Sequence, residues 1–288
     1  MKTAIFLISF LLISAIFVGF WSGGQMGVAA KQQVGKIVPY WEGKYPVLVV
    51  AHRGFSGAAP ENTLIAFKKG IEVGSDMIEL DVHLSRDGEI VVIHDETLER
   101  TTNGKGMVAD HTLKELKRLD GGSSFGPQFA GEKIPTLKEV LDLAKGRVPV
   151  NIEIKNPTHG KYTIAELTEK VLRQVNQAGM MDRIIFSSFN PAALEWIERN
   201  EPRAWIAFLF HRPWNFLRDI PGNQEYAVLN LRNIHLTREK VAEIKKAGKR
   251  INVYTVNTDE ELEQFRQWGV DGIITNHPDR LLRILQKR

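Results

Sequence analysis

The stretch VLVVAHRG, residues 47–54, decides how this chain folds. Five apolar residues are followed at once by a histidine, an arginine and a glycine, as in a buried strand that ends at a polar site. Similar patterns return at MIELDV, residues 77–82, at IVVIHD, residues 90–95, and at NIEIK, residues 151–155. Because amphipathic helical stretches alternate with such runs, we predict parallel strands joined by crossover helices.

The alternation continues to the end of the chain and sets the fold class. We expect strands at residues 47–51, 77–82, 90–94, 148–154, 184–189, 205–210, 227–231, 251–256 and 272–275. We expect helices at residues 63–73, 137–144, 164–178, from Pro191 onward, and at 238–247, 260–268 and 280–286. Residues 31–288 have about the length of a (β/α)8 barrel.

We therefore predict an α/β fold, a (β/α)8 TIM barrel with a small insertion after the third strand. The insertion is expected at about residues 95–135, which are rich in Gly, Thr, Lys and Asp. This segment is long for a simple loop, and functional groups often lie in such segments.

The first thirty residues have the layout of a secretory signal. Lys2 is their only charged residue, an apolar run occupies residues 4–21, and Val28-Ala29-Ala30 suits cleavage. The run is also long enough to cross a bilayer as an uncleaved anchor. We expect residues 1–30 to be a signal peptide or N-terminal membrane anchor, with cleavage favoured. Residues 31–288 would then be an exported domain, secreted or associated with the cell envelope.

Composition excludes several classes of site and partner. The chain has no cysteine, which excludes disulfides, thiolate metal ligands and cysteine nucleophiles. A formal net charge of +4 is too mild to indicate a nucleic acid partner. Membrane association is expected only through residues 4–21, and the sequence indicates no protein partner.

Polar side chains gather where the first strands end. Residues i and i+2 of a strand share a face, so Glu79 and Asp81 point the same way, as do Glu153 and Lys155. Since the C-terminal ends of barrel strands carry the active site, both pairs can face the barrel interior.

The link between residues 81 and 90 is too short for a helical crossover. It is either an extended return or a hairpin that turns near residues 86–88. Both arrangements bring His94 close to Glu79, and in the hairpin we expect residue 79 to lie opposite residue 94.

Three converging carboxylates predict a metal site. Glu79, Asp81 and Glu153 would repel one another and raise their pKa values unless a cation compensates. Oxygen ligands favour Ca²⁺ or Mg²⁺ over zinc. In the alternative, the three carboxylates are simply salt-bridged to Arg53 and Lys155 without a metal.

Two histidines predict acid–base chemistry. His52 and His94 follow neighbouring strands, and a histidine pKa of about 6.5 lets one ring take a proton while the other gives one. Arg53 can bind an anionic phosphate through forked hydrogen bonds, and Lys155 can bind it as a point charge. The remaining histidines, His83 among them, are expected at the surface or in turns.

Six short motifs, taken in order, resemble those of the glycerophosphodiester phosphodiesterase family. They are His52-Arg53-Gly54, Pro60-Glu61-Asn62-Thr63, Glu79-Leu80-Asp81-Val82, Val92-Ile93-His94-Asp95, Leu98 to Asn103 and Glu153-Ile154-Lys155. The resemblance covers residues 47–280. It implies an enzyme that hydrolyses a small-molecule glycerophosphodiester to sn-glycerol 3-phosphate and an alcohol, with bound Ca²⁺ or Mg²⁺.

The resemblance also implies a role for each matching residue. The acid–base pair would be His52 and His94, the metal ligands Glu79, Asp81 and Glu153, and the phosphate contacts Arg53 and Lys155. Which histidine acts as the base stays open. Glu61 and Asn62 would support the loop behind His52.

One motif departs from the family. Where the family often shows Thr-Asp before a Pro-Asp pair, this chain has Thr275-Asn276-His277-Pro278-Asp279. We expect only a peripheral contact to change. Phe189 and Tyr254 are expected either in the core or along the glycerol or alcohol side of the substrate.

Two other functions fit part of this pattern. A phosphodiesterase of the same barrel type that cuts lysophospholipids or phosphatidylinositol would use the same histidines and metal. A noncatalytic phosphate-binding surface protein would need Arg53 and Lys155 but not both histidines, so their joint presence disfavours it.

Overall fold

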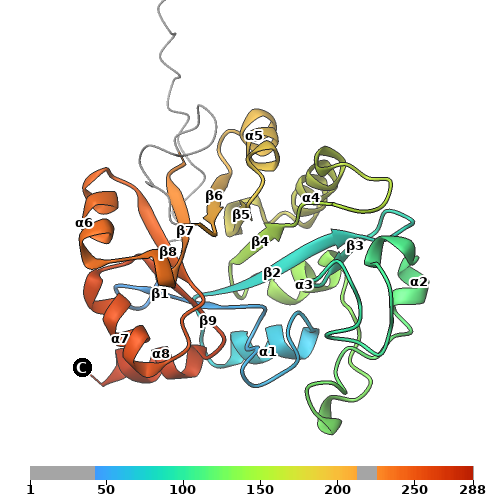
Figure 1. Cartoon of the computed structure of the whole chain (residues 1–288), viewed down its shortest axis with the longest axis horizontal. Helices are drawn as coiled ribbons and strands as arrows, with labels where there is room; N and C mark the ends of the chain where they lie inside the picture. The colour runs from blue at the N-terminus through green and yellow to red at the C-terminus, as the bar shows by residue number, and fades with distance from the viewer. Residues whose placement is uncertain (1–42, 213–225, 288) are drawn as a thin grey trace, which may run out of the picture. The chain divides into compact units, whose positions relative to one another are not determined.

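The computed structural model describes residues 43–212 and 226–287, in which strands and helices alternate (Figure 1). The strands are β1 (Leu48–Ala51), β2 (Met77–Leu84), β3 (Ile90–Val92), β4 (Val150–Ile154), β5 (Ile184–Ser188), β6 (Trp205–Phe210), β7 (Val228–Arg232), β8 (Arg250–Tyr254) and β9 (Gly272–Thr275). The α-helices are α1 (Leu64–Glu72), α2 (Leu113–Leu116), α3 (Leu137–Ala144), α4 (Ile164–Ala178), α5 (Pro191–Asn200), α6 (Arg238–Lys246), α7 (Asp259–Trp268) and α8 (Pro278–Gln286).

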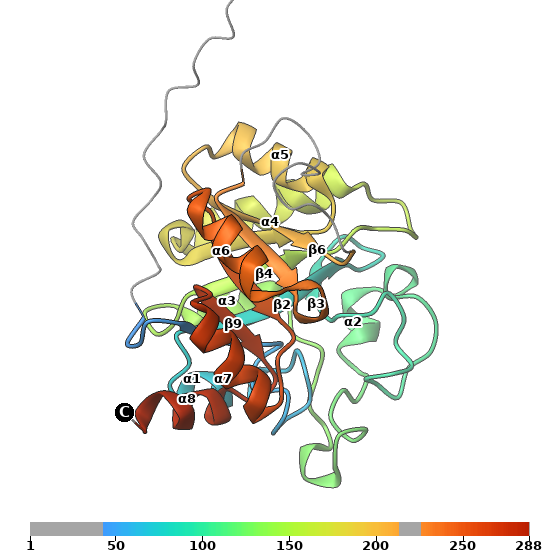
Figure 2. The same cartoon turned by 60° about the vertical axis from the view of Figure 1, so that its left-hand side comes forward.

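Eight of the strands close into a barrel. The order is β1-β9-β8-β7-β6-β5-β4-β2, and β2 pairs again with β1. Every pair in this ring is parallel. The helices lie outside the strands, as α6, α7 and α8 show in Figure 2, and several pack directly on them. The predicted (β/α)8 barrel is confirmed.

The ninth strand, β3, lies outside the ring and pairs antiparallel with β2. The link after Asp81 is thus the hairpin, one of the two arrangements expected. The expected register is wrong by one residue, because Val82 pairs with Val92 and Leu84 with Ile90. A five-residue turn causes the shift: the Ser85 hydroxyl accepts from the backbone of Glu89 and donates to Asp87.

Threonines set where most of the long helices begin. Thr63, Thr136, Thr163, Thr237 and Thr258 are N-caps whose side chains accept a backbone N–H of the first turn. Such caps satisfy donors that a helix start leaves without partners. The predicted helix starts therefore agree with the observed ones to within two residues.

Side chains of the barrel strands alternate between two apolar layers. One layer fills the barrel interior near the strand starts and consists of Leu48, Val50, Met77, Ile185, Ala207, Val228 and Ile274. The other layer lies between strands and helices. Since inward positions recur every second residue, the strand ends beyond the interior layer must deliver the next inward side chains to the mouth of the barrel.

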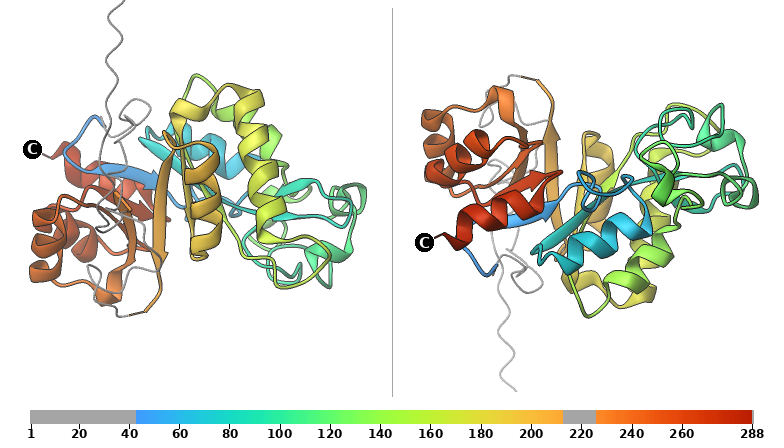
Figure 3. Two further views of the ribbon diagram at one scale, coloured as in Figure 1. Left: turned by 90° about the horizontal axis from the view of Figure 1, so that it is seen from above. Right: turned by 90° about the horizontal axis from the view of Figure 1, so that it is seen from below.

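The segment between β3 and α3 contains the short 3₁₀ helices Val108–Asp110 and Pro127–Phe129 together with α2. It holds an apolar cluster of its own, formed by Val91, Ile93, Leu98, Val108, Leu116 and Ile134. In both views of Figure 3 this green segment lies at the right, beside the barrel strands. The predicted insertion, residues 95–135, coincides with this segment.

In the described residues, no helix combines the length and the apolar character that crossing a bilayer requires. The predicted signal or anchor, residues 1–30, lies outside the residues that the structure describes.

Candidate active site

The three predicted metal ligands lie together at the mouth of the barrel. Glu79 and Asp81 come from β2 and Glu153 from β4, where Asp81 and Glu153 are register partners. Their side chains are buried, and each offers an oxygen that lies within 4.8 Å of the other two. The alternation of side chains along β2 and β4 is what brings them to one place.

Two cations face these carboxylates. The Asp81 carboxylate lies 3.4 Å from Arg53 Nε and 3.4 Å from Lys155 Nζ, and Glu153 lies 2.6 Å from the same lysine nitrogen. Burial opposes ionisation of Asp81, but Lys155 and Arg53 outweigh it and hold its pKa well below the ordinary value. Two of the three carboxylates, Asp81 and Glu153, therefore form the ion pairs with Arg53 and Lys155 that the alternative without a metal predicts.

Glu79 is the carboxylate that these cations leave under-compensated. Burial raises its pKa well above the ordinary value, and the charges of Asp81 and Glu153 raise it further. Its strongest contact is a 2.8 Å hydrogen bond from the backbone N–H of Arg53. A third positive charge at this place would relieve the repulsion.

The oxygen atoms fit a hard divalent ion. Asp81 Oδ1 is buried and accepts no hydrogen bond from any described residue, although it lies 3.4 Å from Lys155 Nζ. Lys155 is shared with Glu153, so two cations face three buried carboxylates, and a further cation would complete their surroundings. Glu79, Asp81 and Glu153 could therefore hold a metal ion.

His52 follows β1 and faces the same carboxylates. Its Nδ1 lies 2.6 Å from Asn276 Oδ1, and its Nε2 lies 3.9 Å from Glu79. Burial, and then the positive charge of Arg53, lower the pKa of His52 to about 4. The expectation that the change at Asn276 is peripheral is wrong, because this side chain orients a predicted acid–base residue.

His94 pairs with a carboxylate, whereas His52 pairs with an amide. The His94 Nδ1 lies 2.6 Å from Asp95 Oδ1, which leaves Nε2 for other contacts. Hydrogen bonds from Arg100 are the largest influence on Asp95 and lower its pKa to about 2, so the carboxylate is ionised at neutral pH. This pairing fixes the ring and its tautomer.

Arg100 joins the histidine to the rest of the site. It donates to both oxygens of Asp95, at 2.5 and 3.0 Å, and to both oxygens of Glu61, at 2.8 Å each. Glu61 also accepts from Arg53 at 2.8 Å. The charges therefore alternate from His94 through Asp95, Arg100 and Glu61 to Arg53. The motifs that resemble the family include Asp95 and Arg100, but the sequence assigned them no role.

Asn62 shapes the backbone under the site. Asn62 and Arg53 have φ values of 56° and 54°, in the left-handed region that costs a non-glycine residue about 1–2 kcal/mol. The N–H of Asn62 donates to the Arg53 carbonyl, and its side-chain amide donates to Asp81 at 2.8 Å. These bonds hold two strained residues beside the buried Asp81 carboxylate.

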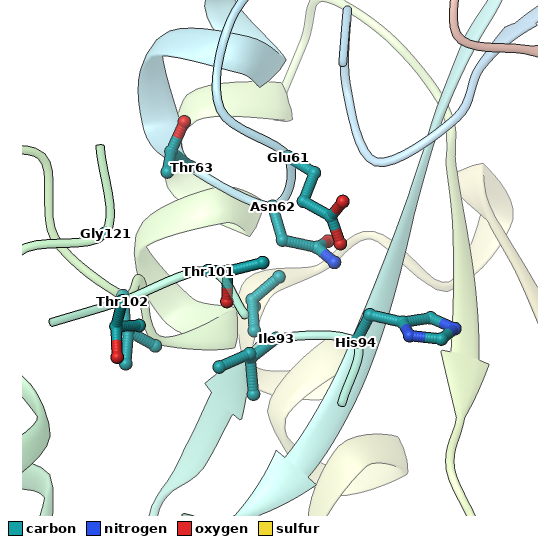
Figure 4. A pocket seen from close by; sticks show the side chains of 10 residues that line it. Glu61, Asn62, Thr63, Ile93, His94, Thr101, Thr102 and Gly121 are labelled. Carbon is teal, nitrogen blue, oxygen red and sulfur yellow. The ribbon is translucent and has the colours of Figure 1, made fainter. Parts of the chain in front are cut away.

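A pocket lies between the start of α1 and the insertion, beside His94 (Figure 4). It is lined by Glu61, Asn62, Thr63, Val92, Ile93, His94, Thr101, Thr102, Gly121 and Ile134. Figure 4 shows Glu61 and Asn62 on one side of it and His94 on another. The insertion therefore reaches the predicted acid–base residue.

His83 does not lie at the surface, contrary to expectation. Its side chain is buried, and its Nε2 lies 3.1 Å from the carbonyl oxygen of His94. It follows Glu79 and Asp81 at inward spacing on β2, so alternation along the strand was the signal that should have placed it inside.

The opposite side of the mouth is aromatic. Phe189 follows β5, and Tyr254 ends β8. The Phe189 ring lies 6.4 Å from that of Tyr254 and 5.4 Å from that of His211, measured between centroids. Neither residue is buried in the core, and their contact with the substrate stays a prediction.

The family model for the glycerophosphoryl diester phosphodiesterase family matches residues 52–280. The chain belongs to this family. It is 42% identical to a glycerophosphodiester phosphodiesterase of Caldanaerobacter subterraneus subsp. tengcongensis, over 83% of this chain and 98% of the relative. A glycerophosphodiester phosphodiesterase of Bacillus altitudinis is 39% identical over the same shares.

Solved structures of glycerophosphodiester phosphodiesterases share the barrel. A phosphodiesterase of Oleispira antarctica, in complex with the product sn-glycerol-3-phosphate, superposes with a TM-score of 0.77 and 29% identity, covering 82% of this chain and 96% of that one. A glycerophosphoryl diester phosphodiesterase assigned in Silicibacter pomeroyi gives 0.77 at 28% identity, covering 86% and 96%. The prediction of a glycerophosphodiester phosphodiesterase is confirmed.

Proposed function

We propose that the protein hydrolyses glycerophosphodiesters to sn-glycerol 3-phosphate and an alcohol, with Ca²⁺ or Mg²⁺ held by Glu79, Asp81 and Glu153. The observation that carries the proposal is the convergence of three buried carboxylates, Glu79, Asp81 and Glu153, within 4.8 Å of one another, with His52 Nε2 3.9 Å from Glu79. The Oleispira antarctica relative with bound product supports the choice of substrate.

Arg53 and Lys155 would bind the phosphate of the diester. Both side chains already lie against the carboxylate group, and each is mostly shielded from solvent. The bound metal would neutralise charge on the phosphate oxygens in the transition state. The two side chains would add fixed positive charge at the same place, which favours the more highly charged transition state.

The histidines would move the protons. His52 is neutral at neutral pH, since burial lowers its pKa to about 4, and its Nδ1 is engaged by Asn276. Its Nε2 is therefore the atom that accepts a proton of the water molecule whose oxygen attacks phosphorus. As the bond from phosphorus to the leaving alcohol breaks, His94 Nε2 donates a proton to the leaving oxygen. Asp95 holds the His94 ring in place through Nδ1.

The test is release of sn-glycerol 3-phosphate from a purified sample supplied with glycerophosphocholine or glycerophosphoglycerol. Release should require Ca²⁺ or Mg²⁺ and stop in excess chelator. Full activity in chelator would remove the metal from the proposal. Release only from lysophosphatidylcholine or phosphatidylinositol would reassign the enzyme to lipid substrates of the same reaction class.

We also propose that the chain is exported. The support is the N-terminal sequence, with Lys2, an apolar run at residues 4–21 and a small-residue cleavage site at residues 28–30. N-terminal sequencing of the mature protein from expressing cells is the test. A chain that starts at residue 31 indicates a cleaved signal, and an intact start in the membrane fraction indicates an anchor.

A further inference from the structure

The side of the mouth opposite the carboxylates is built from inward positions of β5 to β8. Val228 belongs to the interior apolar layer, so Asn230 and Arg232 share its face. Asn252 donates to its register partner Asn230 at 3.0 Å, so both face the interior and Tyr254 is the next inward residue of β8. Arg232 and Tyr254 are register partners at the ends of β7 and β8.

Arg232 is exposed and makes no ion pair with any residue of the described ranges 43–212 and 226–287. Its charge nevertheless acts on its neighbours. Burial and the charge of Glu153 raise the pKa of Tyr254, and Arg232 opposes them. The Tyr254 phenol is therefore influenced by both the Glu153 carboxylate and the guanidinium of its register partner.

A second arginine adds to the positive charge. Burial first, and then Arg212 and Arg232, lower the pKa of His211, so this histidine is neutral at neutral pH. Tyr254 donates its hydroxyl to the carbonyl oxygen of Phe210 at 2.6 Å. Its ring and that of Phe189 thus offer apolar surface, and the arginines offer the charge.

Among the described residues, acidic side chains follow β7 and β8 in the first turns of α6 and α7, outside the barrel. Of these, Glu261 accepts a hydrogen bond from Asn233 at 3.1 Å. None of the inward residues at the ends of β5 to β8 is acidic. Among the described residues at these strand ends, the charged side chains are therefore cationic, so an alcohol with a cationic group would be repelled, whereas an anionic one would meet Arg232.

We propose that this side of the mouth, with Arg232 at its centre, binds the alcohol part of the diester and selects alcohols that carry a further phosphate over those that carry a trimethylammonium group. The inference rests on the proposed function, because the carboxylate side must hold the reacting phosphate. The aromatic rings would then contact the carbon atoms that link the two phosphates.

The test compares bis(glycerophospho)glycerol, whose leaving alcohol bears a second phosphodiester, with glycerophosphocholine. We expect the wild-type enzyme to have the higher kcat/KM for bis(glycerophospho)glycerol, even after halving for its two equivalent ends. Arg232→Gln should lower that kcat/KM about three- to fivefold, the size of one exposed ion pair, mainly through KM. Arg232→Lys should keep part of the preference, and added salt should reduce it.

Arg183→Gln is the matched control, because Arg183 is also exposed but precedes β5 at the other end of the barrel. It should leave the preference unchanged. An equal loss in Arg183→Gln and Arg232→Gln, or a wild-type preference for glycerophosphocholine, would overturn the inference.

Binding to the His94→Ala variant separates this inference from the proposed reaction. Calorimetry on that variant should show tighter binding of bis(glycerophospho)glycerol than of glycerophosphocholine, and Arg232→Gln should remove the difference. If the enzyme turns over neither compound, the proposed function fails, and this binding difference still decides whether Arg232 selects for anionic alcohols.

Discussion

The two sides of the barrel mouth use equivalent strand positions in different ways. On the β1, β2 and β4 side, the inward residues are charged, buried and paired, as Asp81 is with Arg53 and Lys155. On the β5 to β8 side they are aromatic or basic and more exposed, as Phe189 is at 37%. A single barrel can therefore hold strained, desolvated charge on one side and adaptable surface on the other.

The difference also concerns stability. Buried like charges such as Glu79, Asp81 and Glu153 oppose folding, whereas truncating an exposed aromatic residue costs little. Residues retained at a cost to stability are those that chemistry requires. We therefore expect substitutions on the carboxylate side to change the reaction and substitutions on the aromatic side to change substrate preference.

Loss of turnover in a His94→Ala variant is the largest effect that the comparison predicts. The variant should lose 10²- to 10⁴-fold in kcat, about the contribution of a general acid, with metal affinity unchanged. The control is His159→Ala, because His159 also pairs with an aspartate, Asp110 at 2.9 Å, but outside the mouth. Normal turnover in His94→Ala would contradict the assignment of the chemistry to the charged side of the mouth.

A Glu79→Gln variant should be more stable than the wild type without metal and should bind metal more weakly. Since the folded-state pKa of Glu79 is raised, the ionised group destabilises the metal-free fold increasingly as the pH rises above the unfolded value of about 4.3. Without metal, the variant should be more stable than the wild type by about 1–3 kcal/mol at pH 7 and nearly equal to it at pH 4. Urea unfolding in chelator measures this.

The same Glu79→Gln variant should gain less stability from added Ca²⁺ or Mg²⁺ than the wild type does. Glu169→Gln, on the exposed face of α4, is the control and should change neither quantity. A lower stability of the metal-free Glu79→Gln variant at pH 7 would contradict the account of the carboxylate group.

Asn276→Asp should move the acidic limb of the pH profile. A carboxylate 2.6 Å from His52 Nδ1 would raise the low pKa of that ring, by about one unit or more. The base would then be protonated at a higher pH, so kcat/KM would start to fall at a higher pH than in the wild type. A profile of kcat/KM between pH 4 and 9 measures the shift, and an unmoved acidic limb would show that His52 is not the base.

Phe189→Ala should change the kinetic constants least, and it tests whether the aromatic side affects substrate binding without affecting the chemistry. The side chain is partly exposed, so the fold should lose little, while KM should rise about threefold and kcat should stay within about threefold. Phe125→Ala, an exposed phenylalanine of the insertion, is the matched control and should leave KM unchanged. A large fall in kcat with unchanged KM would place Phe189 in the chemistry instead.

The sequence predicted the barrel because its strands are short apolar runs with polar ends. It also placed Glu79, Asp81, Glu153 and Lys155 at the same mouth, because inward positions alternate along a strand and do not depend on distant contacts. His52, Arg53 and His94 were placed there because they directly follow strands. The register of the hairpin was wrong, since it depends on how Ser85 and Asp87 close the turn.

The missed residues act across long separations or through unexpected partners. The Asn276 contact to His52 spans 224 residues of sequence, and the bonds from Arg100 to Glu61 span 39. Nothing in a local pattern distinguishes these side chains from ordinary loop residues. His83 is different, because strand alternation contained the information that placed it inside.

Arg100 and Asp95 both belong to the insertion. Arg100 donates hydrogen bonds to both oxygens of Asp95, the carboxylate that orients His94. Segments of this kind open locally at a lower free energy than the core that carries them. Each opening of the insertion would release Asp95 and leave the barrel folded but inactive. On warming, activity should therefore be lost before the barrel unfolds, and amide hydrogen exchange in residues 95–135 should report the same transition.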